Sequence, residues 1–155
     1  MDIKKDIAEE YVRLQKKYSL PSLNVLDDDF EIVNIIADHK FVPNHMLSVV
    51  RRRMAEACFS WINYLHMFIV PNQQSAINLE EFNIFSDDEK KAFSKIIDRL
   101  MYYSRLSLSL ELTKDEAADA DFIKSLFAEW PEIKKALSPV VQKNISHWKN
   151  ISEKS

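Results

Sequence analysis

The chain has 155 residues, of which 46% are hydrophobic, 29% are charged and none is glycine. A folded chain of about 150 residues buries roughly 68–70% of the surface that its unfolded form exposes, so this length and composition exclude disorder as the main state. Phosphate-binding loops, tight hairpin turns and nucleophile elbows are built from glycine. Its absence excludes the Rossmann, P-loop and α/β-hydrolase classes of protein.

The formal net charge is −3, from 21 Lys and Arg against 24 Asp and Glu, and the two halves of the chain are similarly balanced. Binding to nucleic acid or to an anionic membrane depends on a concentrated positive face, so we expect at most a local basic patch. The single cysteine cannot form an internal disulfide, and the first twelve residues include acids where a secretory signal has its apolar run. The longest apolar run is only 67–70, so we expect a cytoplasmic protein with no membrane segment.

Apolar residues recur at helical spacing from the beginning of the chain. The first amphipathic segment predicts a helix over roughly 2–18. Pro21 favours an extended connector over 20–26, because the residue before a proline is disfavoured in a helix. The three acids at 27–29 are then expected to cap a short second helix that ends before Pro43.

The apolar stripe over about 44–70 predicts the longest helix, which we place at the centre of the fold. After a polar loop at 71–78, a hydroxyl stands three residues ahead of an acid at Ser86 and again at Thr113. This arrangement begins a helix by satisfying two free amides. The two signals predict helices over about 87–112 and 114–129.

Two later features are less regular. Leucines alternate with polar residues over 106–112, as in a strand, but leucine favours helices and no partner strand is available, so we predict helix. Pro131 suits the first turn of a further helix and Pro139 a restart or kink. The expected inner face of that segment consists of Ile133, Leu137, Val141, Ile145 and Trp148. The sequence therefore predicts an all-α, single-domain helical bundle of five to seven helices over 1–155.

Four blocks of the sequence resemble a family of small all-helical proteins that we associate with archaea. These blocks are LPSLNVLDDDFEI at 20–32, MLSVVRRRMAE at 46–56, FNIFSDDEKKAFSKIIDRLMYYSR at 82–105 and DFIKSLFAEWPEIKKAL at 121–137. The resemblance implies a single domain over the whole chain and a prokaryotic cytoplasm without secretion. It implies no active site, because we attach no biochemical activity to this family.

Side chains that could react are scattered over separate helix faces. No two members of the set His39, His45, Cys58, His66 and His147 stand three or four residues apart, the spacing that puts two metal ligands on one helix face. Cys58 lies on the apolar stripe and is expected to be a small buried hydrophobe. We therefore expect no enzyme, no catalytic residue, no metal site and no cofactor.

Acidic residues offer a second kind of metal ligand. The three acids at 27–29, with Glu31, could hold Mg²⁺, since hard cations prefer carboxylate oxygens. Helix capping explains the same residues, and it also explains a second acidic group at 115–121. Capping is the preferred interpretation of both groups.

Three consecutive arginines, Arg51, Arg52 and Arg53, fan over most of a helix circumference, because consecutive residues turn by about 100°. Arg51 or Arg53 must then lie beside the apolar face, where its guanidinium needs a carboxylate, a carbonyl group or a phosphate. One interpretation is an internal ion pair with an acid at 27–31 or with Glu56. The others are a contact with a partner protein or RNA, and solvated charge without a role.

A second basic group lies further along the chain. Lys91, Lys95 and Arg99 are one turn apart on one helix face, and Tyr102 follows them. Such a stripe could follow a phosphate backbone while the tyrosine stacks on a base. Two aspartates lie close by, so a solvated face of mixed charge is the alternative interpretation.

Large amphipathic side chains of the kind found at interface hot spots occur at Tyr102, Tyr103, Trp130 and Trp148, although each is a core residue by default. The leading hypothesis is a non-enzymatic helical protein-interaction module, an adaptor or scaffold that binds a protein partner or itself and has no small-molecule substrate. The alternative is an RNA- or ribonucleoprotein-associated factor that uses the arginine triplet and the basic stripe as a local basic patch.

Overall fold

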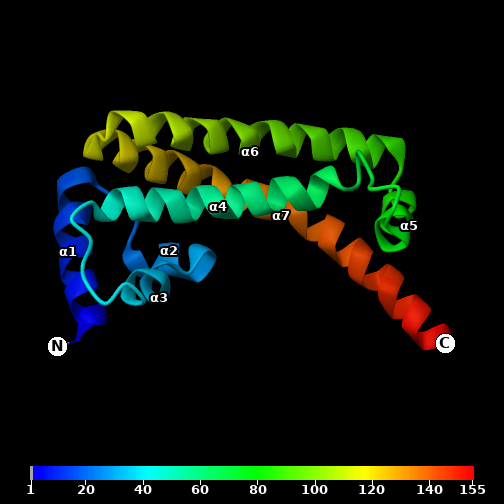
Figure 1. Ribbon diagram of the computed structural model, residues 1–155, viewed down its shortest axis with the longest axis horizontal. Coiled ribbons are helices and arrows are strands. Elements are labelled where there is room, and N and C mark those ends of the chain that lie inside the picture. Colours follow the sequence, from blue (N-terminus) through cyan, green and yellow to red (C-terminus); the bar gives the residue numbers. More distant parts are fainter. Residues whose placement is uncertain (1) are drawn as a thin grey trace. The chain divides into compact units, whose positions relative to one another are not determined.

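The computed structural model describes residues 2–155, which form seven α-helices and no strand (Figure 1). In chain order the helices are α1 (Ile3–Tyr18), α2 (Leu23–Phe30), α3 (Ile32–Ala37), α4 (Met46–His66), α5 (Ala76–Ile84), α6 (Asp87–Thr113) and α7 (Glu116–Lys154). The all-α helical bundle of five to seven helices is confirmed, and 106–112 is helical as expected. None of the helices in these described residues is both long and apolar enough to cross a membrane.

The chain divides into two compact units. Unit 1 comprises Met1–Cys58 and Tyr103–Ala128, and unit 2 comprises Phe59–Tyr102 and Glu129–Ser155. Helices α4, α6 and α7 contribute residues to both units. The single domain expected over 1–155 stays a prediction.

Helix α1 packs against α2 and α3 in unit 1. Its buried residues, Ile7, Tyr11 and Leu14, follow the three-and-four spacing of one helix face. The hydroxyl of Tyr11 donates to the carbonyl oxygen of Pro21 at 2.6 Å, which ties the segment after α1 to the helix itself. The amphipathic pattern of the first eighteen residues is therefore sufficient to locate α1 and its buried face.

Two local predictions for unit 1 are wrong. The extended segment after α1 ends at Ser22, because α2 already begins at Leu23, and the acids at 27–29 lie inside α2. Asp27 nevertheless caps the next helix, since its carboxylate accepts from the amide of Val33 at 2.8 Å. It reaches that amide because Glu31, with φ 52°, turns the chain sharply between α2 and α3.

Among residues 2–155, four residues adopt a positive φ where the chain turns, although none of them is glycine. They are Ser19, Glu31, Lys40 and Lys114. In this left-handed region a side chain crowds the backbone, at a cost of roughly 1–2 kcal/mol per residue that glycine would avoid. At Ser19 and Glu31 the conformation lets the cap amide bond to a carbonyl group of the preceding helix. This glycine-free chain therefore relies on the packing of its helices to hold its turns.

Unit 2 has an aromatic core. The ring of Phe68 packs against that of Phe85, and Phe85 packs against Phe93, with ring centroids 4.8 and 5.0 Å apart. The rings are tilted or edge-on to one another, as aromatic pairs prefer, and all three side chains are buried. They hold together the end of α4 and the start of α6.

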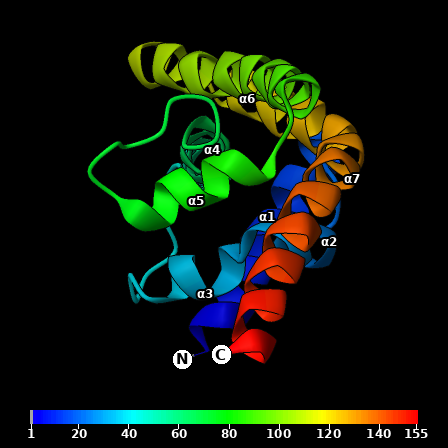
Figure 2. The same cartoon turned by 90° about the vertical axis from the view of Figure 1, so that its right-hand side faces the viewer.

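Helix α5 is not predicted from the sequence, which indicated a polar loop over 71–78. Contacts with α7 hold this short helix, drawn in green in Figure 2. Glu80 lies 3.0 Å from a ring nitrogen of His147, and Glu81 accepts from the indole N–H of Trp148 at 3.1 Å. A local signal is also present, because the hydroxyl of Ser75 caps α5 by accepting from the amide of Asn78 at 3.2 Å, and the sequence reasoning missed it.

Helix α7 is continuous through Pro131 and Pro139, so the separate helices predicted in this region are wrong. It has 39 residues and α6 has 27, against 21 for α4, so the prediction that α4 is the longest helix is wrong as well. A proline inside a helix removes a hydrogen bond and costs about 3 kcal/mol. The apolar residues that α7 buries on both sides of its prolines offset that cost.

The buried face of α7 is also displaced from the predicted one. Ile133 and Leu137 are buried as expected, but Val140 and Asn144 take the next inward positions. Ile145 is instead 52% exposed. The predicted face advanced by four residues at each step from Ile133 to Ile145, whereas the observed face advances by four, three and four residues, as the 3.6-residue period of a continuous helix requires.

One of the two predicted helix starts is confirmed. Ser86 and Glu89 form the reciprocal pair, since the serine hydroxyl accepts from the Glu89 amide at 3.2 Å and the glutamate accepts from the Ser86 amide at 3.0 Å. Thr113 is the last residue of α6 and caps nothing ahead of it. Asp115 caps α7 by accepting from the amide of Ala117 at 3.0 Å.

Replacing Ser86 by Ala should lower the free energy of unfolding by about 1 kcal/mol, because an amide in the first turn of α6 loses its acceptor. Urea denaturation followed by circular dichroism measures the change. Ser109→Ala, at an exposed position within α6, is the matched control and should change stability by less than about 0.5 kcal/mol. Equal effects of the two substitutions would contradict the cap.

Candidate functional site

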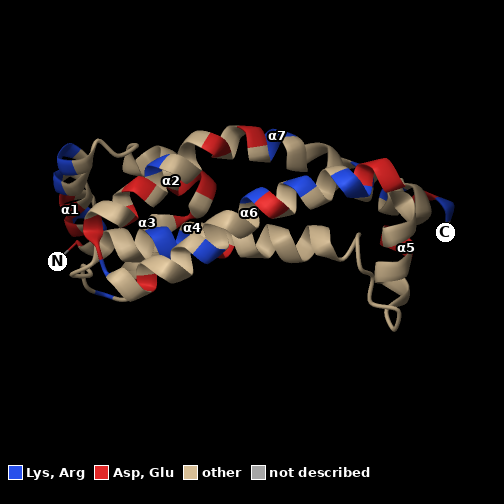
Figure 3. Ribbon diagram, turned by 90° about the horizontal axis from the view of Figure 1, so that it is seen from above, with Lys and Arg blue, Asp and Glu red and all other residues tan. Residues whose placement is uncertain are grey.

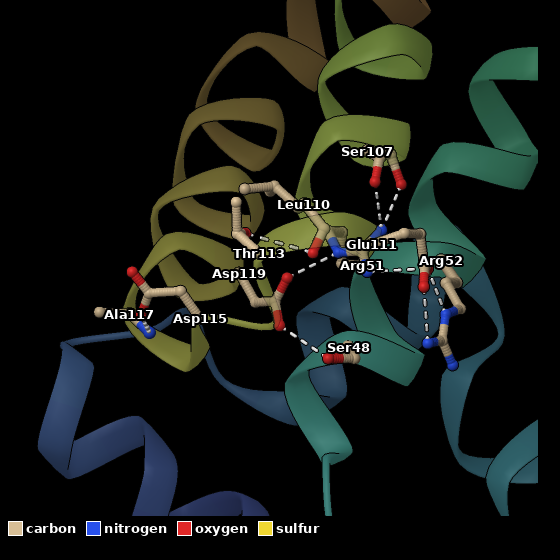
Figure 4. Close-up of polar contacts among 10 residues, drawn as sticks. All are labelled: Ser48, Arg51, Arg52, Ser107, Leu110, Glu111, Thr113, Asp115, Ala117 and Asp119. Atoms are coloured by element: carbon tan, nitrogen blue, oxygen red, sulfur yellow. Dashed lines mark hydrogen bonds and ion pairs between the residues drawn. The ribbon is translucent and has the colours of Figure 1, made fainter.

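The first of the three consecutive arginines is buried in unit 1 (Figure 4). The Arg51 side chain is 1% exposed, and its Nε donates to Oδ1 of Asp119 at 2.6 Å. Its Nη2 donates to Glu111 at 2.9 Å, and its Nη1 donates to the carbonyl and hydroxyl oxygens of Ser107 at 2.9 and 2.5 Å. Asp119, 2% exposed, also accepts from the hydroxyl of Ser48 at 2.7 Å. Every guanidinium nitrogen therefore has an acceptor inside the protein.

These five residues form what we term the Arg51 network, which joins α4, α6 and α7 within unit 1. The structure thus places an internal ion pair at Arg51, one of the interpretations considered for the triplet. Its partners are Asp119 and Glu111 and not the acids at 27–31 or Glu56. Sequence reasoning missed Asp119 because it stands 68 residues away, in an acidic group that capping already explained.

The other two arginines lie nearer the surface. Arg52 is about half exposed and binds both carboxylate oxygens of Glu111. Arg53 donates from Nε to the carbonyl oxygen of Phe30 at 2.8 Å and lies 3.8 Å from Glu31 and 3.4 Å from Glu56. Partners at 27–31 and at Glu56 were therefore correctly expected for Arg53.

A cavity of about 170 Å³ lies beside the Arg51 network, and its wall includes the carboxylates of Glu111, Glu116 and Asp119. A hydrogen bond from Arg52, and then one from Arg51, lowers the pKa of Glu111 to about 2. The hydroxyl of Tyr18 likewise lowers the pKa of Glu116. A general acid at neutral pH needs a raised pKa, so Glu111 and Glu116 are suited instead to accept hydrogen bonds.

Cys58 and the histidines do not assemble a reactive centre in the part of the chain that the structure describes. Burial raises the pKa of the Cys58 thiol to about 12, whereas a nucleophilic cysteine needs a lowered pKa. Residues 2–155 contain no group of three or more His, Cys, Asp or Glu that could hold a metal ion.

The predicted basic stripe lies in unit 2. Lys91 and Lys95 are exposed, whereas the Arg99 side chain, 40% exposed, lies 3.5 Å from Glu132 and 3.8 Å from Glu129. Tyr102 is 62% exposed. Along this part of α6, Lys and Arg are interspersed with Asp and Glu (Figure 3), so the stripe has acidic neighbours in the same helix.

Beside the stripe is an apolar groove between α6 and α7, with a volume of about 410 Å³. We term it the α6/α7 groove. The residues that line it are Glu89, Ala92, Phe93, Lys95, Ile96, Ala136, Pro139 and Val140. Helices α6 and α7 run antiparallel here, as the ion pairs Lys143–Glu89 and Arg99–Glu132 indicate. This arrangement brings the lining residues of the two helices close together. Sequence reasoning named Lys95 but missed the groove, because its floor is formed by small side chains from two distant segments.

A second hollow of unit 2 lies along the end of α7 and is lined by Tyr64, Ile145 and Trp148, among others. Asn144 forms part of its wall and donates from its amide nitrogen to the hydroxyl of Tyr64 at 2.9 Å. Of the four amphipathic side chains noted in the sequence, Tyr103 and Trp130 are buried. Trp148 is half-buried in this hollow, and Tyr102 is exposed.

Comparison of the chain with protein-family models, with curated proteins and with solved structures found no match. The resemblance to an archaeal family of helical proteins therefore stays a prediction.

Replacing Arg51 by Met should lower the free energy of unfolding by about 3–5 kcal/mol, because Asp119 would remain buried without its cation. Asp119→Leu should cost a similar amount, and the double variant should cost less than the sum of the two. Denaturant unfolding of the three variants and the wild type measures these values. Arg52→Met is the control, with an expected cost below about 1 kcal/mol for a half-exposed ion pair. Strict additivity in the double variant would contradict the pairing.

The lowered pKa of Glu111 predicts that stability depends on pH. Unfolding returns its carboxyl group to an ordinary pKa of 4.5, so the carboxylate contributes fully above that pH and its contribution is lost as pH falls toward about 2. Glu111→Gln should therefore destabilise the protein at neutral pH, and its difference from the wild type should narrow near about pH 3. Urea denaturation at both values measures this. Asp98→Asn, at an exposed position of α6, is the control. If the stability difference between Glu111→Gln and the wild type does not change with pH, the prediction is wrong.

Proposed function

We propose that this chain is a non-enzymatic helical interaction module that binds a protein partner in the α6/α7 groove of unit 2. The observation that carries the proposal is the groove itself, an apolar depression of about 410 Å³ on a folded helical surface. Apolar surface left open to water marks a binding site more often than a solvated face does, because covering it is favourable.

Two further observations support an adaptor or scaffold over an enzyme. The buried Arg51–Asp119 pair serves the interior of unit 1, and the carboxylates beside it are held as hydrogen-bond acceptors. The thiol of Cys58 has a raised pKa. The proposal also places the module in a prokaryotic cytoplasm, which rests on the four sequence blocks that resemble an archaeal family.

An RNA-binding role is the second candidate, and the exposed lysines of α6 favour it. Lys91 and Lys95 are one turn apart and Tyr102 is exposed beyond them, so a phosphate backbone and a stacked base could both be engaged. Arg99 adds less positive charge to this surface, because Glu129 and Glu132 lie beside it. Such binding would weaken steeply as salt concentration rises.

The test is a pull-down from the source cells with the tagged chain, with and without nuclease. Ala92→Phe fills the groove from an exposed position and should reduce capture of partner proteins at least about tenfold, equivalent to about 1.4 kcal/mol of binding free energy. Ala8→Phe, at an exposed position of α1, is the matched control and should capture as the wild type does. If nuclease abolishes the capture of partner proteins, the result favours RNA binding. If both variants capture partner proteins equally, the groove is not the binding site.

A further inference from the structure

The charges at the rim of the α6/α7 groove that lack an ion-pair partner are mainly positive. Lys95 borders the groove from α6, and Lys135, next to Ala136, flanks it from α7. Both lysines are exposed, and neither takes part in an ion pair within residues 2–155. Asp98, three residues after Lys95, and Asp88, two turns before it, are exposed acids of α6 that likewise take part in no ion pair within residues 2–155, but neither lines the groove.

The acids that border the groove are already neutralised. Glu89 lies 2.7 Å from the Nζ of Lys143 at one end, and this contact lowers the pKa of the glutamate. At the other end Arg99 lies between Glu129 and Glu132. The apolar floor is therefore flanked by lysines whose charge has no internal partner.

We infer that the partner bound in this groove is an acidic amphipathic helix of another protein. The inference rests on the proposed function and adds the chemistry of the partner. The apolar face of such a helix would cover the groove floor, and its carboxylates would lie opposite Lys95 and Lys135. Charge complementarity of this kind selects partners and speeds their association.

The dimensions of the groove fit a short helix. The two ion pairs that close it involve Glu89 and Arg99, ten residues apart in α6, which corresponds to about 15 Å or roughly three helical turns. Ala92 and Ala136 contribute only methyl groups to the floor. Small side chains at a contact let helix axes approach closely, so a third helix can pack onto α6 and α7.

Pro139 changes the backbone hydrogen bonding of α7 beside the groove. It lines the groove, and it has no N–H to donate to the carbonyl oxygen of Lys135, four residues earlier in α7. That carbonyl therefore lacks the intrahelical donor that a residue other than proline at position 139 would supply.

The groove floor favours a peptide over a nucleic acid. Phe93 is the aromatic side chain in the lining, and at 4% exposed it cannot stack on a base. A phosphate backbone held by the two lysines would leave the aliphatic floor in contact with water. An amphipathic helix covers the floor and meets the lysines at the same time.

Selection from a library of random peptides of about 15 residues, long enough for roughly four helical turns, tests the inference on the full chain. Enriched peptides should carry an excess of Asp and Glu, with apolar residues at three-and-four spacing. Their binding to the double variant Lys95→Glu, Lys135→Glu should be at least about tenfold weaker than to the wild type, and the difference should shrink as salt rises. The Ala92→Phe substitution should abolish binding of the enriched peptides.

The matched control is the double variant Lys149→Glu, Lys154→Glu, which changes the net charge equally at exposed positions near the end of α7. It should bind the peptides as the wild type does, and circular dichroism checks that each variant is folded.

The outcomes separate the inference from the proposed function. If the enriched peptides fail to bind the Ala92→Phe variant but show no excess of Asp and Glu, the inference is wrong and the proposed function remains intact. If all the enriched peptides still bind the Ala92→Phe variant, both the inference and the proposed function are wrong. Binding of a uridine oligonucleotide that only the Lys95, Lys135 variant loses, without enriched peptides, would replace the inference with RNA recognition.

Discussion

The ion pair between Arg51 and Asp119 is the constraint on which the arrangement of unit 1 depends. Both side chains are almost fully buried, so each must have the other in reach whenever the unit is folded. A buried ion pair adds little stability over an apolar pair of the same shape, but breaking it is costly. The pair, with Glu111 and Ser107, therefore fixes how α4, α6 and α7 align, because a helix that slips by one turn would leave a charge without its partner.

Two acids beside the cavity of unit 1 are held as hydrogen-bond acceptors by neighbouring side chains. Glu111 is held ionised by Arg52 and Arg51, and Glu116 accepts from Tyr18. Their hydrogen-bonding capacity is directed at residues of the same unit. Glu111 and Glu116, which line the cavity, are thus already hydrogen-bonded to other side chains of unit 1.

Unit 2 is organised differently, by aromatic packing and by the continuity of α7. Phe68, Phe85 and Phe93 fill its interior, and small residues on the facing sides of α6 and α7 leave a groove above them. The two prolines of α7 do not end the helix, because burial on both sides of each proline offsets the lost hydrogen bonds. An apolar groove with basic margins follows from that packing, and the proposed function depends on it.

The sequence by itself determined the all-α class, the positions of α1 and α4 to within a few residues, and the reciprocal cap of Ser86 and Glu89, because each depends on residues within a few turns of one another. It also indicated that one arginine of the triplet lies beside the apolar face and needs a carboxylate, a carbonyl group or a phosphate there, with an internal ion pair as one interpretation. Only the tertiary structure decided that Asp119 is the partner and that α7 continues through Pro139 with Val140 facing inward. These outcomes depend on contacts between residues far apart in the chain, and a local pattern carries no information about which distant side chain will offset a local cost.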